Sequence, residues 1–159
     1  MEDTETLWLL DCVIESHRPG LPLGNLTSQL LVNIYMNEFD QFVKHKLKIK
    51  HYIRYADDFV FFYPTRSRSI RELPVIRDFL SSKLKLELHP NKVFIKTIAS
   101  GVAFLGWVHF PDHRVLRTAT KRRIGKRLNE KNRASYEGLL KHGNTHRIGL
   151  TLGIGEDTI

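Results

Sequence analysis

Cysteine is nearly absent from this chain of 159 residues, which contains Cys12 alone. A single cysteine excludes an internal disulfide and a cysteine-based zinc cluster. Cys12 lies among the aliphatic residues Leu9, Leu10, Val13 and Ile14, which predicts a buried thiol on a helix. We therefore expect a protein of a reducing compartment.

The chain also lacks the apolar run that a transmembrane span needs. Its acidic start, Met1-Glu2-Asp3, has neither the basic flank nor the apolar core of a signal peptide. Among the eight histidines, His142 and His146 are four residues apart, but Gly143 and Asn144 between them favour surface positions over a metal site. These features lead us to expect a cytoplasmic protein with no membrane partner.

Acidic residues are scarce in one part of the chain, and basic residues gather there. The formal net charge is +8 and the isoelectric point is about 9.7. Between Arg114 and Arg147 there are eleven Lys and Arg residues against Glu130 and Glu137. Thr118 or Thr120 could cap a helix there, with Ile124 and Leu128 on one face and basic side chains elsewhere. The excess indicates a polyanionic partner, and nucleic acid is the simplest one; the alternative is a helix face that is merely solvated.

The most informative segment is an apolar stretch interrupted by two acids, Asp57 and Asp58. β-branched and aromatic residues on both sides of a turn-prone acidic pair predict a hairpin over 50–63. Carboxylates at its tip would repel each other, and a bound divalent cation such as Mg²⁺ would compensate. The alternative is an ordinary solvated turn without chemistry.

A turn rich in glycine and proline precedes a predicted helix over 26–46. Asn25 or Thr27 could cap this helix, and apolar residues recur along it at a helical period. By themselves these features describe a capped amphipathic helix. A functional interpretation depends on their order relative to the acidic pair.

Four motifs in this chain resemble, in order and spacing, palm motifs B, C, D and E of reverse transcriptases of the retron and group II intron-like class. They are Gly20-Leu-Pro-Leu-Gly24-Asn-Leu-Thr-Ser28-Gln29, Tyr55-Ala-Asp-Asp58, Leu88-His-Pro-Asn-Lys92 and Phe104-Leu-Gly-Trp107. The resemblance implies an RNA-directed DNA polymerase that uses an RNA template, a DNA primer and deoxynucleoside triphosphates.

The resemblance also implies roles for residues. Asp57 first and Asp58 second would be catalytic metal ligands, in an enzyme that holds two Mg²⁺ ions. Lys92 would lie near the leaving pyrophosphate and supply charge or a proton; its alternative is an ordinary surface lysine. The remaining assignments are Gly24, Asn25, Ser28 and Gln29 at the nucleotide and template, Phe104, Leu105, Gly106 and Trp107 as the primer grip, and Lys121, Arg122, Lys126 and Arg127 on the nucleic-acid backbone.

Motif B departs from the common pattern of the family. Most members have Gln-Gly-x-x-x-Ser-Pro, whereas this chain has Leu23-Gly24-Asn25-Leu26-Thr27-Ser28-Gln29. That variant is similar to the enzymes of diversity-generating retroelements, where it accompanies error-prone copying of template adenines. An ordinary retron enzyme or intron maturase is the alternative subtype.

Motif A, the second source of catalytic carboxylates, is not found in the sequence. Asp11 belongs to a predicted amphipathic helix over 4–16 and not to a strand end. The resemblance therefore implies a C-terminal palm fragment, whose fingers and motif A would come from a further segment or an accessory protein. A degenerate module that binds nucleic acid or a partner without catalysis is the alternative function.

The expected fold is α+β, a palm with an antiparallel sheet backed by helices and followed by the start of a helical thumb. We expect the palm over 1–117, a basic helix over 118–142 and a flexible tail over 143–159. Within the palm, Pro74 should start or kink a helix over 70–84. Short strands are expected near 86–88, 92–98, 102–110 and 113–117.

Overall fold

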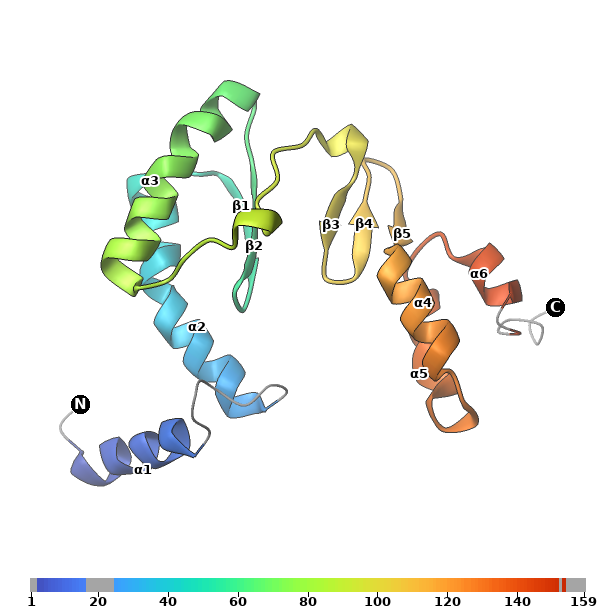
Figure 1. Ribbon diagram of the computed structural model, residues 1–159, viewed down its shortest axis with the longest axis horizontal. Helices are drawn as coiled ribbons and strands as arrows, with labels where there is room; N and C mark the ends of the chain where they lie inside the picture. Colours follow the sequence, from blue (N-terminus) through green and yellow to red (C-terminus); the bar gives the residue numbers. More distant parts are fainter. Residues whose placement is uncertain (1–2, 17–24, 152, 154–159) are drawn as a thin grey trace. The chain divides into compact units, whose positions relative to one another are not determined.

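The computed structural model describes residues 3–16, 25–151 and 153, and it divides into two compact units, 1–92 and 93–159. The described elements are α-helices and two small antiparallel sheets, so the predicted α+β class is confirmed. Figure 1 shows the elements of both units. The predicted boundaries of palm, thumb and tail stay predictions.

The longer helical segments of unit 1 are largely those that the sequence indicated. The predicted helices over 4–16 and 26–46 are confirmed, although the last turn of the second is a π-helix. Pro74 lies inside the next helix and does not start it, because the side chain of Thr65 caps that helix one residue before Arg66. The helical bounds are α1 (Thr4–Glu15), α2 (Leu26–Gln41), the π-helical segment η1 (Phe42–Lys46) and α3 (Arg66–Leu84).

The core of unit 1 lies between one face of the predicted hairpin and the helices α2 and α3 (Figure 1). The hairpin is confirmed as β1 (His51–Tyr55) paired with β2 (Asp58–Phe62) in an antiparallel register. Phe39 of α2 is fully buried and touches aromatic rings of both strands and of α3. This packing fixes the hairpin against α2, whose first four residues are the last four of motif B.

The apolar residues that recur at a helical period along 26–46 differ in their exposure. Phe39 of α2 and Val43 of the following segment η1 are fully buried, whereas Leu26, Leu30 and Ile34 are 60 to 82% exposed. The C-terminal half of α2 therefore contributes to the core, and the N-terminal half extends past it within the described residues.

Two predicted strands are wrong. Residues 86–88 and 92–98 have no ladder partner among the described residues, and a single extended segment without one is not a strand. Short 3₁₀ turns stand here, η2 (Pro90–Lys92) and η3 (Ile98–Ser100). Leu88 still packs against the unit 1 core.

The strands of unit 2 form a three-stranded antiparallel sheet in the order β3-β4-β5. Its strands are β3 (Val102–Phe104), β4 (Trp107–His109) and β5 (Arg114–Leu116). The single strand predicted over 102–110 is thus two strands, because Leu105 and Gly106 adopt positive φ and reverse the chain.

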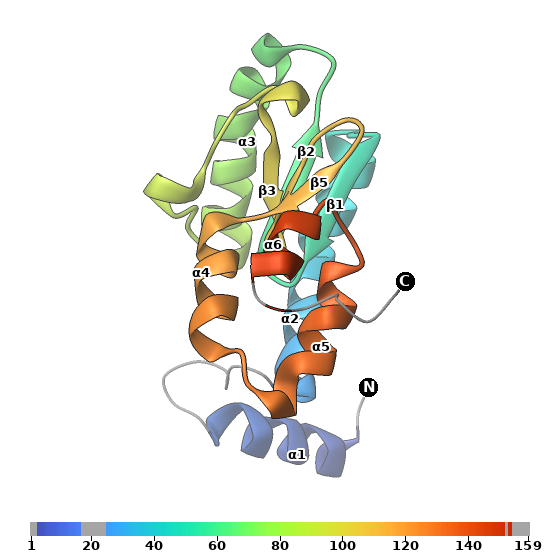
Figure 2. The same cartoon turned by 90° about the vertical axis from the view of Figure 1, so that its right-hand side faces the viewer.

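The single basic helix predicted over 118–142 is two helices, α4 (Thr118–Arg127) and α5 (Glu130–Leu140). Figure 2 shows them joined by a short connection. The break follows from Asn129, whose side chain exchanges hydrogen bonds with Asn132 in a capping box that starts a new helix. Neither threonine caps α4: it begins after Arg117, and Thr120 is buried.

A third helix, α6 (His146–Thr151), stands where the sequence indicated no regular element. Thr145 before it is buried, and the backbone N–H of Asn144 donates to the carbonyl of Arg114 at 2.9 Å. Gly143 permits this approach, because a Cβ there would lie 2.2 Å from Trp107 Cζ3. This part of the expected tail is therefore packed.

Cys12 is exposed, so the predicted buried thiol is wrong. The reason is that no residue of α1 is buried within the described part of the chain. None of the helices in the described ranges is long and apolar enough to cross a membrane.

Candidate functional site

The two acids lie at the reversal of the hairpin in unit 1. Tyr55 pairs with Asp58, and Ala56 and Asp57 form a two-residue turn between them. Ala56 has a φ of 51°, in the left-handed region, while Asp57 does not. Positive φ at the first turn position alone is typical of a type II′ hairpin turn. Both carboxylates are exposed.

Two adjacent carboxylates suit a hard divalent cation such as Mg²⁺, which binds oxygen ligands. They form only part of a metal site, however. Across the described ranges, no group of three or more His, Cys, Asp or Glu side chains is arranged to hold a metal ion. A complete site would therefore need a further oxygen ligand in addition to Asp57 and Asp58.

Motif B and motif C meet at the N-terminal half of α2. The Gln29 side-chain amide donates to the hydroxyl of Tyr55 at 3.1 Å, which places Gln29 beside the residue that opens the acidic turn. Asn25 is exposed and precedes the helix, but its side chain makes no capping hydrogen bond. Ser28 lies one residue before Gln29 and is half-buried. Gly24 lies outside the described residues.

A charged network that the sequence analysis missed connects β1 to α2. Arg54 forms an ion pair with Asp40, and the hydroxyl of Tyr52 also donates to Asp40 at 2.8 Å. Burial is the largest influence on the pKa of Asp40 and raises it, but hydrogen bonds from Arg54 and Tyr52 outweigh burial and hold this pKa below its usual range. Burial and the neighbouring Asp40 raise the pKa of Tyr52.

One feature of the sequence could have indicated this network. Tyr52 and Arg54 alternate with His51, Ile53 and Tyr55, so a strand that puts Tyr52 inside also puts Arg54 inside. An inward-facing arginine requires an acidic partner. The sequence does not identify Asp40 as that partner, because Asp40 reaches Arg54 only when the hairpin packs against α2.

Lys92 is the last residue of η2 and of unit 1. Its side chain is exposed, and its backbone N–H donates to the carbonyl of His89 at 3.0 Å. The side chain of His89 accepts from the N–H of Asn91, which tightens the same turn. The Pro-Asn turn inferred from the sequence is therefore present.

The residues assigned to the primer grip form the β3-β4 turn of unit 2. Leu105 and Gly106 are the two turn residues, with φ of 48° and 85°. Leu105 is 48% exposed at the tip, whereas Trp107 is 7% exposed and belongs to the unit 2 core. The turn thus presents Leu105, and Trp107 supports it from inside.

Helix α4 presents a basic surface opposite its buried side. Ile124 is fully buried, and Arg122 and Lys126 lie on the opposite face because each is two residues away. The side chains of all four residues assigned to the nucleic-acid backbone are exposed; they are Lys121, Arg122, Lys126 and Arg127. The helix contains no acidic residue. Such a surface can contact phosphates.

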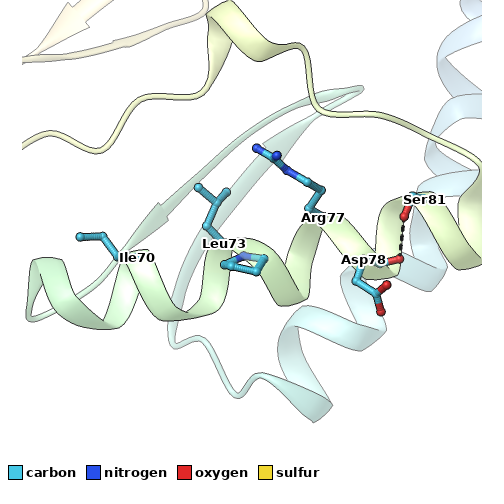
Figure 3. Close-up of a pocket in the computed structure, with 6 residues that line it drawn as sticks. Ile70, Leu73, Arg77, Asp78 and Ser81 are labelled. Carbon is cyan, nitrogen blue, oxygen red and sulfur yellow. Dashed lines mark hydrogen bonds between the residues drawn. The ribbon is translucent and has the colours of Figure 1, made fainter.

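A shallow pocket of about 510 Å³ lies on α3 and has no part in this arrangement. Figure 3 shows that its lining comes from successive turns of that helix, with Arg77 and Asp78 pointing to different sides. None of the residues assigned to a function lines it.

The family profile described as reverse transcriptase (RNA-dependent DNA polymerase) matches residues 16–109, more than half of the chain. The match covers the acidic hairpin, motif B and the β3-β4 turn. The chain therefore belongs to the reverse transcriptase family.

A curated relative is Protein YkfC of Escherichia coli, which is 29% identical over 136 residues. The match includes 64% of this chain and 34% of YkfC. The chain thus spans about a third of the length of this relative.

Proposed function

We propose that this chain provides the catalytic palm hairpin of an RNA-directed DNA polymerase. The observation that carries the proposal is the exposed Asp57-Asp58 pair at a tight turn, held against the motif B helix in a member of the reverse transcriptase family. The proposed reaction is template-directed nucleotidyl transfer to a primer 3′ hydroxyl.

Asp57 is the proposed principal ligand of Mg²⁺, and Asp58 is the second. The carboxylates of the turn would hold two Mg²⁺ ions, which would supply positive charge at the nucleotide phosphates and at the primer hydroxyl. A motif A carboxylate from a further segment would complete the site, so we expect the 159-residue chain to be inactive by itself.

The nucleotide and template are proposed to lie along the start of α2, at Gly24, Asn25, Ser28 and Gln29. The hydrogen bond between Gln29 and Tyr55 supports this placement, because it joins motif B to the acidic turn. The non-standard motif B favours a diversity-generating retroelement enzyme as the subtype. We propose Lys92 as the residue that supplies charge or a proton at the leaving pyrophosphate.

The primer and the duplex are the proposed ligands of unit 2. Leu105 at the tip of the β3-β4 turn would support the primer end, with Phe104, Gly106 and Trp107 shaping that turn. The exposed basic face of α4, as the start of a thumb, would follow the RNA–DNA backbone without reading its sequence. The proposed setting is the cytoplasm.

A reconstituted enzyme tests this proposal. The chain is joined to the upstream fingers and motif A segment of a related reverse transcriptase, and primer extension on an RNA template is measured with Mg²⁺. We expect extension that Asp57→Asn reduces by at least about a hundredfold, because a metal ligand is removed.

The matched control is Asp78→Asn, which removes an exposed carboxylate of α3 and should leave extension unchanged. Near-normal extension by Asp57→Asn would contradict the metal assignment. A reconstituted protein that binds duplex and never extends would favour the non-catalytic binding module. Mg²⁺-dependent extension by the chain alone would contradict the need for motif A.

A further inference from the structure

Arg54 is a charged residue on the inward face of the hairpin. It pairs across the ladder with Phe59, and Tyr52 pairs with Phe61, so these four side chains share the face that packs on the helices. The Arg54 side chain is only 10% exposed. A charge in this position is unfavourable unless hydrogen bonds replace its water.

Three residues provide those hydrogen bonds. The guanidinium binds Asp40 through two nitrogens, with Nε to Oδ1 at 2.9 Å and Nη2 to Oδ2 at 2.5 Å. The remaining nitrogen, Nη1, donates to Asn33 Oδ1 at 3.0 Å and to the carbonyl oxygen of Ala56 at 2.8 Å. Arg54 therefore ties two positions of α2, seven residues apart, to the acidic turn.

The contact with Ala56 acts on the peptide that carries Asp57. The carbonyl of Ala56 and the N–H of Asp57 belong to one planar unit, so a hydrogen bond to that oxygen fixes the plane of both. Ala56 adopts a φ of 51°, which is less favourable for alanine than for glycine. The turn thus has a conformation that local preference does not favour, and Arg54 binds its carbonyl.

We propose that Arg54, anchored to Asp40 and Asn33 of α2, is a positioning residue that sets the direction of the Asp57 carboxylate for metal binding. The inference rests on the proposed function, because it assumes that Asp57 holds the ion. Arg54 does not touch the metal or substrate in this role. It acts by holding the peptide from which Asp57 projects.

Lysine cannot replace arginine in this arrangement. The planar guanidinium donates in several fixed directions, and here two nitrogens bind one carboxylate while the third reaches the turn. A lysine ammonium keeps the charge but lacks the fork. Arg54→Lys therefore removes the geometry while leaving the formal charge near Asp57 unchanged.

Manganese titration of the full chain, followed by amide NMR, tests the proposal without requiring catalysis. Mn²⁺ broadens amide signals close to where it binds, and the metal alone is the probe. In the wild type we expect broadening of residues 56–59 at lower Mn²⁺ than elsewhere. Asp57→Asn should remove this preference, which tests the metal assignment by itself.

Arg54→Lys should raise the Mn²⁺ midpoint at the turn by about tenfold, as expected when a residue that orients a ligand is replaced. Arg54→Gln tests whether Mn²⁺ affinity rises or falls when the arginine is removed. Coulomb attraction alone predicts tighter Mn²⁺ binding after a positive charge is removed, whereas loss of positioning predicts weaker binding. The matched control is Arg68→Lys, which alters the Arg68–Glu72 ion pair of the same unit and should leave the midpoint unchanged.

Asn33→Ala keeps the experiment decisive if either Arg54 variant fails to fold. Asn33 is exposed, and its removal leaves the Arg54–Asp40 pair in place, so the fold should persist. We expect a midpoint about threefold higher, since Nη1 loses one of its two acceptors.

The outcomes separate the two claims. Wild-type broadening that Asp57→Asn abolishes, together with wild-type midpoints in the folded Arg54 and Asn33 variants, would overturn the positioning role and leave the metal assignment intact. Tighter binding by a folded Arg54→Gln would also overturn it. Absence of selective broadening in the wild type would overturn both claims.

Discussion

The β1-β2 and β3-β4 turns of this protein share one backbone feature, but the helices beside them carry opposite charges. Each turn has two residues, and each places a non-glycine residue at positive φ, Ala56 in unit 1 and Leu105 in unit 2. Helix α2, beside the first turn, has acidic residues and no lysine or arginine. Helix α4, beside the second, has five basic residues and no acid.

The two turns are also held by different groups. Side chains hold the first, through Gln29 and the Arg54 network. The second is held at the Gly106 carbonyl, which accepts the Thr120 hydroxyl and the Arg117 backbone N–H, both at 3.0 Å. The stability of a turn held by an ion pair should depend on charge and pH. The stability of a turn held by neutral groups should depend on side-chain size and backbone geometry.

The largest effect we expect concerns the basic helix. Replacing Lys121, Arg122, Lys126 and Arg127 by Gln together should weaken binding to RNA–DNA duplexes of unrelated sequence about equally, by roughly a hundredfold at low salt. The slope of log affinity against log salt should fall by on the order of one for each phosphate that the variant no longer neutralises. Titrations at several salt concentrations measure both quantities.

The control for that variant removes the same charge from unit 1. Lys46, Lys50, Arg71 and Arg77 are exposed there, two lysines and two arginines as in the test set. Their replacement by Gln should change the salt slope little. An unaltered slope in the α4 variant would contradict the assignment of α4 to the nucleic-acid backbone.

The next effect is on stability. Arg54→Ala leaves Asp40 without its ion-pair partner, and removing one partner of a fully buried pair costs about 3–5 kcal/mol. Because the Asp40 side chain is 31% exposed, we expect a smaller loss of about 2 kcal/mol in the free energy of unfolding of unit 1. Thr120→Val, which removes one neutral hydrogen bond at the second turn, should cost unit 2 about 1 kcal/mol. Urea unfolding followed at amides of each unit compares the two losses, and equal losses would contradict the distinction.

Acid should affect the first turn through Asp40. The folded pKa of Asp40 lies below its ordinary value of 3.8, so the ionised carboxylate stabilises unit 1 above that pH. This contribution disappears as the pH falls through the folded pKa. In Asp40→Asn the stability of unit 1 should therefore fall less steeply below about pH 4 than in the wild type. Urea unfolding between pH 6 and pH 2.5 measures the slopes, with Asp78→Asn as the control; identical slopes in wild type and Asp40→Asn would contradict this prediction.

The smallest effects come from exchanging alanine and glycine between the turns. Gly106→Ala places a Cβ at a φ of 85° and 3.3 Å from Thr120 Oγ1, and should cost unit 2 about 1 kcal/mol. Ala56→Gly relieves the unfavourable φ of alanine and should stabilise unit 1 by roughly 0.5 kcal/mol, after the greater chain entropy of glycine is subtracted. The free energy of unfolding of each variant measures these effects. A change of the same sign for both substitutions would contradict the prediction that the φ of each turn residue determines its effect on stability.

Much of unit 1 could be predicted because its information is local. The acids within a β-forming stretch specified the hairpin, and helical periodicity specified α1 and most of α2. Periodicity failed where it had to choose a partner. It placed Cys12 in a core that α1 does not enter, and it predicted a strand over 92–98 without a neighbour to pair with.

By itself, the sequence determined the family, the acidic turn and the basic region, because these depend on residues adjacent or a few positions apart in the chain. Only the tertiary structure decided which residues from other elements contact and support these segments. Asp40 meets Arg54 because hairpin and α2 pack around Phe39, and Gly143 meets Trp107 because α5 returns the chain to the unit 2 sheet. Such contacts depend on how separate elements pack together. Side-chain periodicity shows which face of an element is buried, but not which other element covers that face.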